Sequence, residues 1–335
     1  MKKLIEKLKN KNELTENEII SIVNSIEQNT FDKDEMKEFL LTMQEKTINA
    51  NELFFFVNEL YKKANKIDLG ENLIDVCGTG GDNTGTFNIS TASMFVVAGA
   101  GVKIAKHGNK AVSSKSGSFD VLDELGIDIT NCSSKAKETL EKTNIALLFA
   151  PMHHPVFKNI GEVRKEIGQK TIFNIMGPLL NPCGVKKQLI GIYDENMTEL
   201  IAKTMQKKGI TNGMVVNGSG LDEITINGTT KVTELKNNKI TNYTITPEQF
   251  GIKQADIKDL VVKDKTESAK VIMSVLEGND SPAADIVILN SAAAIYISGK
   301  ANTLEEGVTK ARESIKSGAA LASLNKLREI LKKEE

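Results

Sequence analysis

The sequence predicts an α/β protein with a small N-terminal α-helical domain and a larger α/β domain, whose mostly parallel central sheet has flanking helices. Apolar residues recur at helical spacing through residues 1–66. From residue 72 onward, short apolar segments alternate with helical stretches, which is typical of parallel strands joined by crossover helices. The C-terminal stretches Asp285–Ile297 and Leu304–Lys332 are again helical in pattern. These observations together predict the fold class.

Five short apolar segments are the predicted strands, namely Leu73–Cys77, Val102–Ala105, Ile145–Phe149, Gln188–Tyr193 and Met214–Asn217. Residues 151–182 interrupt the alternation and hold four of the six prolines. We expect an excursion towards the N-terminal helices there, with one helix around Ile160–Gly168. Asn227-Gly228 lies among Thr, Ile and Val residues and predicts a hairpin turn. The N-terminal helices carry no acid/base cluster or glycine-rich loop, which favours a packing or dimerisation role.

Composition excludes several classes of function. The 43 basic and 44 acidic residues give a net charge of −1, so no global field attracts nucleic acid or an anionic membrane. The longest apolar runs, such as Met94–Ala100, are too short to span a bilayer, and the N-terminus lacks the apolar segment of a secretory signal. Cys77, Cys132 and Cys183 are odd in number and far apart, which excludes a CxxC metal pair and favours reduced thiols in the cytoplasm.

The first candidate site is Asp75–Thr91, DVCGTGGDNTGTFNIST, in which an apolar strand leads into a glycine-rich loop and a helix near Ser90. Glycines let backbone N–H groups approach an anion closely, and a helix N-terminus adds donors and a favourable dipole. No lysine follows Gly85, so this is not a Walker A loop, and the spacing is not GxGxxG. Asp82 adds a carboxylate for ribose hydroxyls or a metal-bound water. A purely structural turn is the alternative, and the density of glycines and hydroxyls favours phosphate binding.

The second candidate site is Lys106–Ser118, KHGNKAVSSKSGS, between a predicted strand and a helix containing Val121, Leu122 and Leu125. Three lysines and four serines surround two glycines, which predicts a second, mobile anion-binding loop. A surface charge run is the alternative, and the embedded His-Gly-Asn argues against it. Two such loops at adjacent strand ends suit a ligand with two phosphate groups.

The third candidate site runs from Pro151-Met-His-His-Pro155 through Arg164 to the segment 173–182, FNIMGPLLNP. Arginine occurs only three times in the chain, so Arg164 is notable, and its planar group could bind a small carboxylate in a bidentate manner. The alternative, favoured when the segment is taken in isolation, is that Arg164 pairs with Glu162 or Glu166 on a helix surface.

The fourth candidate site is Gly218-Ser-Gly-Leu-Asp-Glu223, which follows the predicted strand Met214–Asn217. Adjacent carboxylates at the carboxyl end of a strand can hold Mg²⁺ against a diphosphate. An acidic pair in a turn is common, so this signal is weak alone.

Taken together and in this order, the four segments resemble the anthranilate phosphoribosyltransferases of tryptophan biosynthesis. The family signatures GTGGD, KHGN with SSKSGS, HHP with a downstream Arg, GPLxNP and DE match Gly78–Asp82, Lys106–Ser118, His153–Arg164, Gly177–Pro182 and Asp222–Glu223. The resemblance covers nearly everything from residue 70 onward. It implies a pentosyltransferase that moves the phosphoribosyl group of 5-phosphoribosyl 1-pyrophosphate to the amine of anthranilate, the second step from chorismate to tryptophan.

The resemblance also implies partners, domains and metal. The substrates are small molecules, two Mg²⁺ ions bind per active site, and the protein is a cytoplasmic homodimer with no nucleic-acid or membrane partner. The helical, dimerising domain would span 1–68 with the excursion around 155–185, and the catalytic domain would span 69–154 and 186–335. No covalent nucleophile is expected, and Cys77 is expected to be a small buried residue.

Site residues follow from the matching positions. The phosphoribosyl pyrophosphate site would comprise Gly78, Gly81, Asp82, Thr86, Asn88, Ile89, Ser90, Thr91, Lys106, His107, Gly108, Asn109, Lys110, Ala111, Val112, Ser113, Ser114 and Ser118. Magnesium would be bound by Ser90, Asp222 and Glu223, and anthranilate by Gly78, Asn109 and Arg164, with His107 and Pro178 lining its channel. The sequence departs from the family at Lys110, where Arg is common, and at Phe119, where a smaller residue is usual. Phe119 leaves the packing beside the pyrophosphate loop open.

Two alternatives remain. A pyrimidine nucleoside phosphorylase has a similar fold, but its glycine loop differs and it has no comparable DE pair. A non-catalytic relative could bind nucleic acid through a basic face of Lys106, Lys110 and Lys115. The near-zero net charge and the intact substrate motifs argue against it, and the salt dependence of binding would discriminate.

Overall fold

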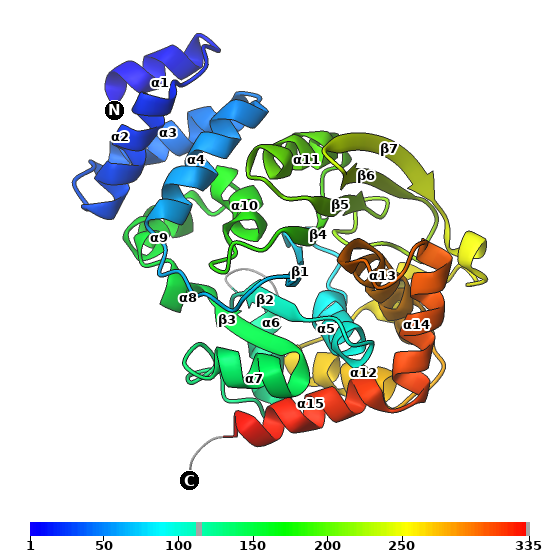
Figure 1. The fold of residues 1–335 in the computed structure, drawn as a ribbon. Coiled ribbons are helices and arrows are strands. Elements are labelled where there is room, and N and C mark those ends of the chain that lie inside the picture. Colours follow the sequence, from blue (N-terminus) through cyan, green and yellow to red (C-terminus); the bar gives the residue numbers. More distant parts are fainter. Residues whose placement is uncertain (112–115, 333–335) are drawn as a thin grey trace.

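The computed structural model describes residues 1–111 and 116–332, which form a seven-stranded sheet covered by helices on both faces (Figure 1). The first five strands in spatial order are parallel and the last two are antiparallel. In that order the strands are β3 (Ile145–Phe149), β2 (Ile104–Gly108), β1 (Ile74–Gly78), β4 (Lys187–Gly191), β5 (Asn212–Asn217), β6 (Thr230–Lys236) and β7 (Lys239–Ile245). All five predicted strands are therefore present, shifted by a few residues at their ends, and the mostly parallel sheet is confirmed.

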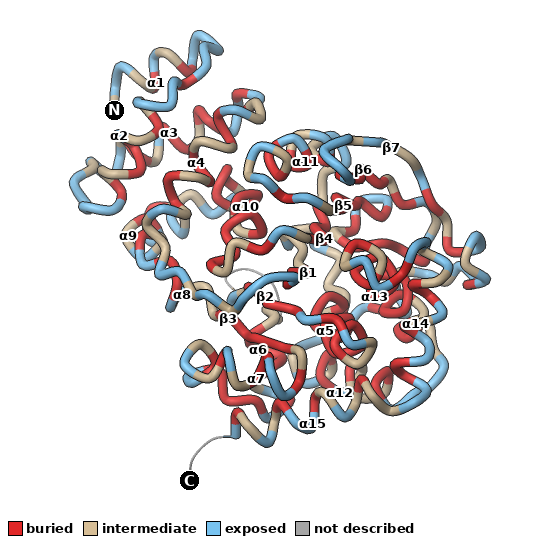
Figure 2. Tube along the Cα trace, in the orientation of Figure 1, coloured by how far each residue is buried: buried red, intermediate tan, exposed pale blue. Residues whose placement is uncertain are grey.

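One face of the sheet is covered by two layers of helix. The inner layer contains α5 (Ile89–Gly99) and α13 (Pro282–Ser298), and nearly every residue of both is buried (Figure 2). The outer helices α12 (Lys265–Leu276), α14 (Leu304–Lys316) and α15 (Ala319–Ile330) pack against α5. This explains why the inner helices are apolar on all sides rather than along one stripe.

The N-terminal segment folds into the predicted helices, which lie beyond the opposite face of the sheet (Figure 1). They are α1 (Lys2–Lys9), α2 (Glu16–Glu27), α3 (Lys33–Glu45) and α4 (Ala50–Lys62). Thr15 and Asn49 begin α2 and α4 with capping boxes, in which the side chain of each cap accepts a backbone N–H and a glutamate three residues on reaches back.

The excursion packs against these helices, but it contains more helix than predicted. Instead of one helix it holds α8 (Ala150–His153), α9 (Val156–Ile167), α10 (Ile172–Met176) and the 3₁₀ helix η1 (Gly177–Leu180). Pro151 and Pro178 lie in the first turns of α8 and η1, where a missing N–H costs nothing, so they begin helices rather than interrupt one. Helix α9 contacts α2 and α3, and η1 contacts α4.

A single apolar core joins the N-terminal helices, the excursion and the sheet. It includes Phe39 and Phe56 of the N-terminal helices, Ile160 of α9, and Ile190 and Val215 of the central strands. Helix α11 (Thr198–Lys207) also belongs to it and contacts α4. The N-terminal helices are thus anchored on the sheet and on the excursion together.

The hairpin is present, but its predicted turn is wrong. Strands β6 and β7 are joined at Asn237-Asn238, both with positive φ (51° and 60°), and not at Asn227-Gly228. A two-residue turn of the type that matches strand twist requires positive φ at both positions, which two asparagines tolerate. The pair at 227–228 lies in the loop before β6 instead. Across the described ranges, no helix is long and apolar enough to cross a membrane.

The remaining helical elements are short and lie between the larger ones. They are α6 (Ser118–Glu124), α7 (Ala136–Thr143), η2 (Glu195–Met197), η3 (Pro247–Phe250) and η4 (Ile257–Leu260). Their importance for the site is that α6 begins where the second candidate loop ends.

Candidate active site

The glycine-rich loop after β1 lies directly against the acidic loop after β5. The backbone N–H of Gly80 donates to Asp222 Oδ2 at 2.6 Å. A Cβ atom on Gly78 would lie 2.2 Å from the same oxygen, and Gly80 and Gly81 have positive φ (67° and 81°). Glycine is therefore required in this loop both by backbone conformation and by the close approach of a carboxylate.

Ser90, in the first turn of α5, lies against Glu223. Its backbone N–H donates to Glu223 Oε1 at 3.2 Å and its hydroxyl donates to the same oxygen. Together with Asp222, these groups gather two carboxylates and a hydroxyl, the hard oxygen ligands that Mg²⁺ prefers. In the described parts of the chain, no group of three or more Asp, Glu, His or Cys side chains is arranged to hold a metal. Further ligands would therefore be phosphate oxygens and water.

The electrostatics of this pair favour a bound cation. Burial raises the pKa of Glu223 to about 7. Burial also raises the pKa of Asp222 well above its usual range, and the negative charges of Glu223 and Asp82 add to this effect. Two carboxylates held together away from water repel each other, and a divalent cation between them would relieve that repulsion.

The rest of the glycine loop is tied to its surroundings. Asp82 accepts from the backbone N–H of Thr84 at 3.1 Å and from its hydroxyl at 2.9 Å, and Thr86 bridges to Val261. Asn88 Nδ2 donates to the carbonyl of Ser116 at 3.3 Å, and Asn88 Oδ1 accepts from the Ser116 hydroxyl at 2.9 Å. The two candidate phosphate loops are therefore joined directly. Ile89 and Thr91 are buried in the first turn of α5.

The second loop differs from its predicted form at Lys106. This side chain is buried, and its ammonium donates to the Val76 carbonyl at 2.7 Å. It therefore stays beneath the sheet edge, where its charge opposes the rise in the pKa of Glu223, and it is not part of an exposed basic face. Its side chain lies on the same face of the sheet as that of Val76, because the register of β1 and β2 places the two residues side by side in adjacent parallel strands.

The described ends of this loop are drawn together. Asp120 Oδ2 accepts from the backbone N–H groups of Ala111, at 2.7 Å, and Gly117, at 3.0 Å. Asn109 and Lys110 are exposed, and Ser118 donates to the Asn109 carbonyl at 3.3 Å. Gly108 is close to the same hydroxyl, and Phe119 is buried against Phe149, with 5.0 Å between ring centroids. Val112, Ser113 and Ser114, with Lys115, lie outside the described residues.

A row of rings connects His107 to Arg164. His107 lies edge-on to His154 (5.1 Å between centroids), and His154 contacts Phe157 (5.9 Å). Phe157 in turn contacts Phe173 (5.6 Å), and the Arg164 guanidinium lies 5.7 Å from the Phe173 centroid. His107 is buried, its Nε2 has no hydrogen-bond partner in the described structure, and burial holds its pKa well below the usual range. A row of neutral rings ending at a guanidinium suits a planar aromatic acid.

The surface ion pair considered for Arg164 is absent. Within the described residues Arg164 pairs with neither Glu162 nor Glu166, and Glu162 pairs with Lys33 of α3 instead. Arg164 is partly buried, and the described chain supplies no hydrogen-bond acceptor to its guanidinium.

Beneath the row of rings lies a buried polar clamp that the sequence reasoning missed. Asn181 Nδ2 donates to Asp75 Oδ2 and to the Ala105 carbonyl, both at 2.8 Å, and Asp75 Oδ1 accepts from the His107 N–H at 3.3 Å. Gln188 Nε2 donates to the Pro178 carbonyl at 2.7 Å. Burial raises the pKa of Asp75, and the nearby Lys106 charge opposes that rise. The available signal was the presence of Asp75 and Gln188 inside otherwise apolar strands.

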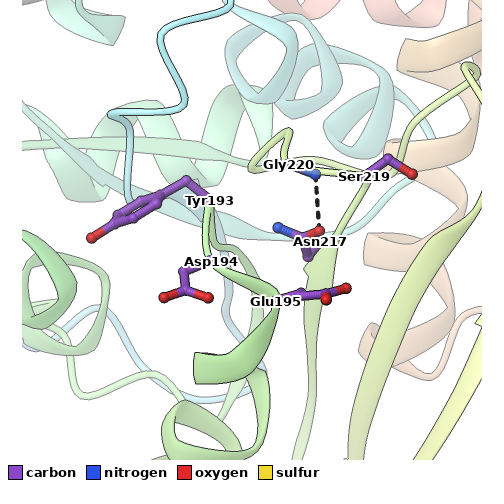
Figure 3. A pocket seen from close by; sticks show the side chains of 6 residues that line it. All are labelled: Tyr193, Asp194, Glu195, Asn217, Ser219 and Gly220. Carbon is purple, nitrogen blue, oxygen red and sulfur yellow. Dashed lines mark hydrogen bonds between the residues drawn. The ribbon is translucent and has the colours of Figure 1, made fainter. Parts of the chain in front are cut away.

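A pocket of about 390 Å³ adjoins the site at the carboxyl ends of β4 and β5 (Figure 3). It is lined by Tyr193, Asp194, Glu195, Asn217, Ser219 and Gly220. The N–H of Gly220 donates to Asn217 Oδ1 at 3.0 Å, which shapes the turn just before Asp222. None of the predicted site residues that the structure describes lines this pocket.

The structure brings together residues predicted to bind phosphoribosyl pyrophosphate and magnesium, here called the donor side, more directly than those predicted to bind anthranilate, here called the acceptor side. On the donor side, Gly78 lies against Asp222, and Ser90 binds Glu223. On the acceptor side, Arg164 is connected to His107 only through the intervening rings. Pro178 is connected to the sheet through the hydrogen bond that its carbonyl accepts from Gln188. Cys77 is half-buried rather than buried, because it lies at the end of β1 beside the loop.

Known proteins resemble this chain over almost its whole length. Residues 70–321 match the model of a glycosyl transferase family, a/b domain. The anthranilate phosphoribosyltransferase of Thermoanaerobacter sp. (strain X514) is 42% identical over 99% of this chain and 98% of its own length. That of Acetivibrio thermocellus is 42% identical, covering 98% and 96% of the two chains.

Solved structures of such enzymes are similar as well. The crystal structure of the Thermus thermophilus enzyme superposes with a TM-score of 0.91 at 31% identity, covering 98% of both chains. The Saccharomyces cerevisiae enzyme in complex with PRPP and Mg gives a TM-score of 0.84 at 27% identity, covering 94% and 92%. The chain therefore belongs to the anthranilate phosphoribosyltransferase family.

Proposed function

We propose that this chain transfers the phosphoribosyl group of 5-phosphoribosyl 1-pyrophosphate to the amine of anthranilate, which yields N-(5-phosphoribosyl)anthranilate and pyrophosphate. The observation that carries the proposal is the junction of the glycine loop with the acidic loop, where Gly80 binds Asp222 and Ser90 binds Glu223. This junction gives backbone donors for a diphosphate and oxygen ligands for a metal at one sheet edge.

Magnesium would be held by Ser90, Asp222 and Glu223, and we propose two ions per active site. When bound, the metal neutralises charge that develops on the departing pyrophosphate. The raised pKa values of the two carboxyl groups support this assignment, since burial disfavours their negative charges and a bound cation would compensate for it. The described glycine loop, from Gly78 to Thr91, would hold the pyrophosphate, and Asp82 would be available to the ribose.

The acceptor would bind between the two sides of the site. Arg164 would bind its carboxylate through paired N–H groups, while Gly78 and Asn109 contact it and His107 and Pro178 line its channel. The aromatic amine of anthranilate is neutral at pH 7 and can attack C1 of the ribose directly, as the bond from C1 to pyrophosphate breaks and that carbon gains positive character. The amine loses a proton after the new bond forms. Positioning then supplies much of the catalysis. Burial raises the pKa of the Cys77 thiol well above its usual range, so that it stays protonated and a poor nucleophile, which supports a mechanism without a covalent intermediate.

The assembly and setting of the enzyme are further parts of the proposal. Residues 1–68 with the excursion around 155–185 would form a dimerising helical domain, and 69–154 with 186–335 the catalytic domain. The N-terminal helices support it because they pack with α9 and carry no candidate catalytic residue. Three free thiols agree with a cytoplasmic setting. A phosphorylase activity or nucleic-acid binding has less support, since the acidic pair is intact and Lys106 is buried.

The test is a direct assay. Purified protein, anthranilate, phosphoribosyl pyrophosphate and Mg²⁺ are mixed, and the loss of anthranilate fluorescence is followed over time. A loss of fluorescence that needs the protein, phosphoribosyl pyrophosphate and Mg²⁺ is expected, and chelation of the metal should stop it. Absence of magnesium-dependent loss would contradict the proposed function.

A further inference from the structure

Lys170 occupies a position beside the glycine loop that the proposed function leaves unused. It lies in the excursion between α9 and α10, and its Nζ is 3.2 Å from the centroid of the Tyr193 ring. A Cβ atom built on Gly81 would lie 2.7 Å from Lys170 Cε and 3.2 Å from Nζ. The lysine thus fills the space that a side chain at position 81 would take. Glycine is therefore needed there both for the contact with Lys170 and for the positive φ.

The ammonium group of Lys170 has no oxygen partner in the described structure. None of the described residues forms an ion pair or hydrogen bond with it, although the side chain is only partly exposed. The face of Tyr193 is its observed partner, and such a contact stabilises a cation by about 0.5–2 kcal/mol, less than a phosphate would. Tyr193 lies at one end of the pocket after β4, with its hydroxyl turned away from Asn217 and Gly220 (Figure 3).

The position of Lys106 makes the Lys170 ammonium group more important for the glycine loop. Because its ammonium is committed to the Val76 carbonyl beneath the sheet edge, Lys106 does not stand over the glycine loop in this state. Lys170 contacts that loop at Gly81, which precedes Asp82 in the chain. A phosphate group bound to the N–H groups of the glycine loop would lie within reach of a flexible lysine that is already in contact with the loop.

We propose that Lys170 is a further pyrophosphate-binding residue of this enzyme, held beside Gly81 by Tyr193 until the donor arrives. The inference rests on the proposed function, whose donor supplies the pyrophosphate.

The experiment compares Lys170→Ala and Lys170→Arg with wild-type protein and with Lys165→Ala, an exposed lysine of α9 that serves as the matched control. Steady-state kinetics give KM for each substrate, and calorimetry measures binding of inorganic pyrophosphate with Mg²⁺. Lys170→Ala should raise the donor KM and the pyrophosphate Kd about tenfold. Its anthranilate KM at saturating donor should change less than threefold, and Lys170→Arg should recover most of the loss. Lys165→Ala should behave as wild type.

Variants of Tyr193 test how the lysine is held. Tyr193→Phe keeps the ring face and should keep the donor KM, whereas Tyr193→Leu should raise it several-fold. If Lys170→Ala only lowers the melting temperature and leaves pyrophosphate binding intact, the lysine only stabilises the fold and the inference is wrong. If wild-type protein binds pyrophosphate in a Lys170-dependent way but does not consume anthranilate, the proposed function fails while the inference stands.

Discussion

The donor side and the acceptor side of the site are built by different means. The donor side is formed where parallel strands end, and its groups are fixed by hydrogen bonds between neighbouring loops, such as Gly80 to Asp222. The acceptor side depends on an excursion between strands, and ring contacts connect Arg164 to the sheet. A sheet edge thus fixes the groups that we propose for the diphosphate, whereas the groups that we propose for the aromatic acid depend on packing between helices.

The sharpest test of the donor side removes the acidic pair. Asp222→Asn with Glu223→Gln keeps the shape but removes both negative charges, so two of the three proposed magnesium ligands lose the charge that attracts the ion. We expect kcat/KM to fall on the order of 10³-fold, comparable to the loss of a major electrostatic contribution. A magnesium titration of activity should shift to higher concentration. Glu313→Gln, at an exposed site of α14, is the control, and an unchanged titration in the double variant would remove the pair as ligands.

The acceptor side should respond to pH through His154. Burial lowers the pKa of this residue to about 4, while its Nε2–H donates to the Leu180 carbonyl at 2.8 Å. In the unfolded chain its pKa is about 6.5, so between pH 6.5 and 4 the unfolded state binds a proton that the folded state does not. His154 therefore contributes stability that is complete above pH 6.5 and is lost as the pH falls towards 4.

Urea unfolding at pH 7.5 and 5 measures this contribution. Wild-type protein should lose about 2 kcal/mol more than His154→Gln over that interval, because glutamine can still donate to Leu180 but does not titrate. Burial lowers the pKa of His107 as well, and His154 adds to that shift, so the comparison measures His154 together with its effect on His107. Equal losses would show that the imidazole is not the group responsible.

The polar clamp is the structural link between the two sides. Asn181→Ala leaves the buried carboxylate of Asp75 without the amide that donates to it, which should lower the free energy of unfolding by about 2 kcal/mol. The anthranilate KM should rise because the chain around Pro178 loosens, while the magnesium titration stays as in wild type. The exposed Asn196→Ala serves as the control. A shift in the magnesium titration would mean that the two sides are not separable in this way.

The difference between the donor side and the acceptor side also explains which contacts the sequence could predict. The glycine loop and the acidic pair are contiguous motifs that follow predicted strands, and parallel strands bring their carboxyl ends to one edge, so their proximity follows from the pattern. Asp75 meets Asn181 and Gln188 from a segment more than a hundred residues away, and no local periodicity reports that contact. Nor does any local pattern report the contact between Lys170 and Gly81. The charge of Lys106 is visible in the sequence and its burial is not, and its place in the phosphoribosyl pyrophosphate site stays a prediction.

Arg164 gives the smallest expected effect and the most specific one. The guanidinium lies over Phe173 and has no carboxylate partner in the described chain, so its loss should cost little stability. Arg164→Ala should raise the anthranilate KM about tenfold, which corresponds to one charged hydrogen-bond contact, and leave the donor KM within threefold. Arg164→Lys keeps the charge but loses the planar fork, so it should recover only part of the affinity. If both KM values rose equally, Arg164 would act on the closure of the whole site and the two sides would be one unit.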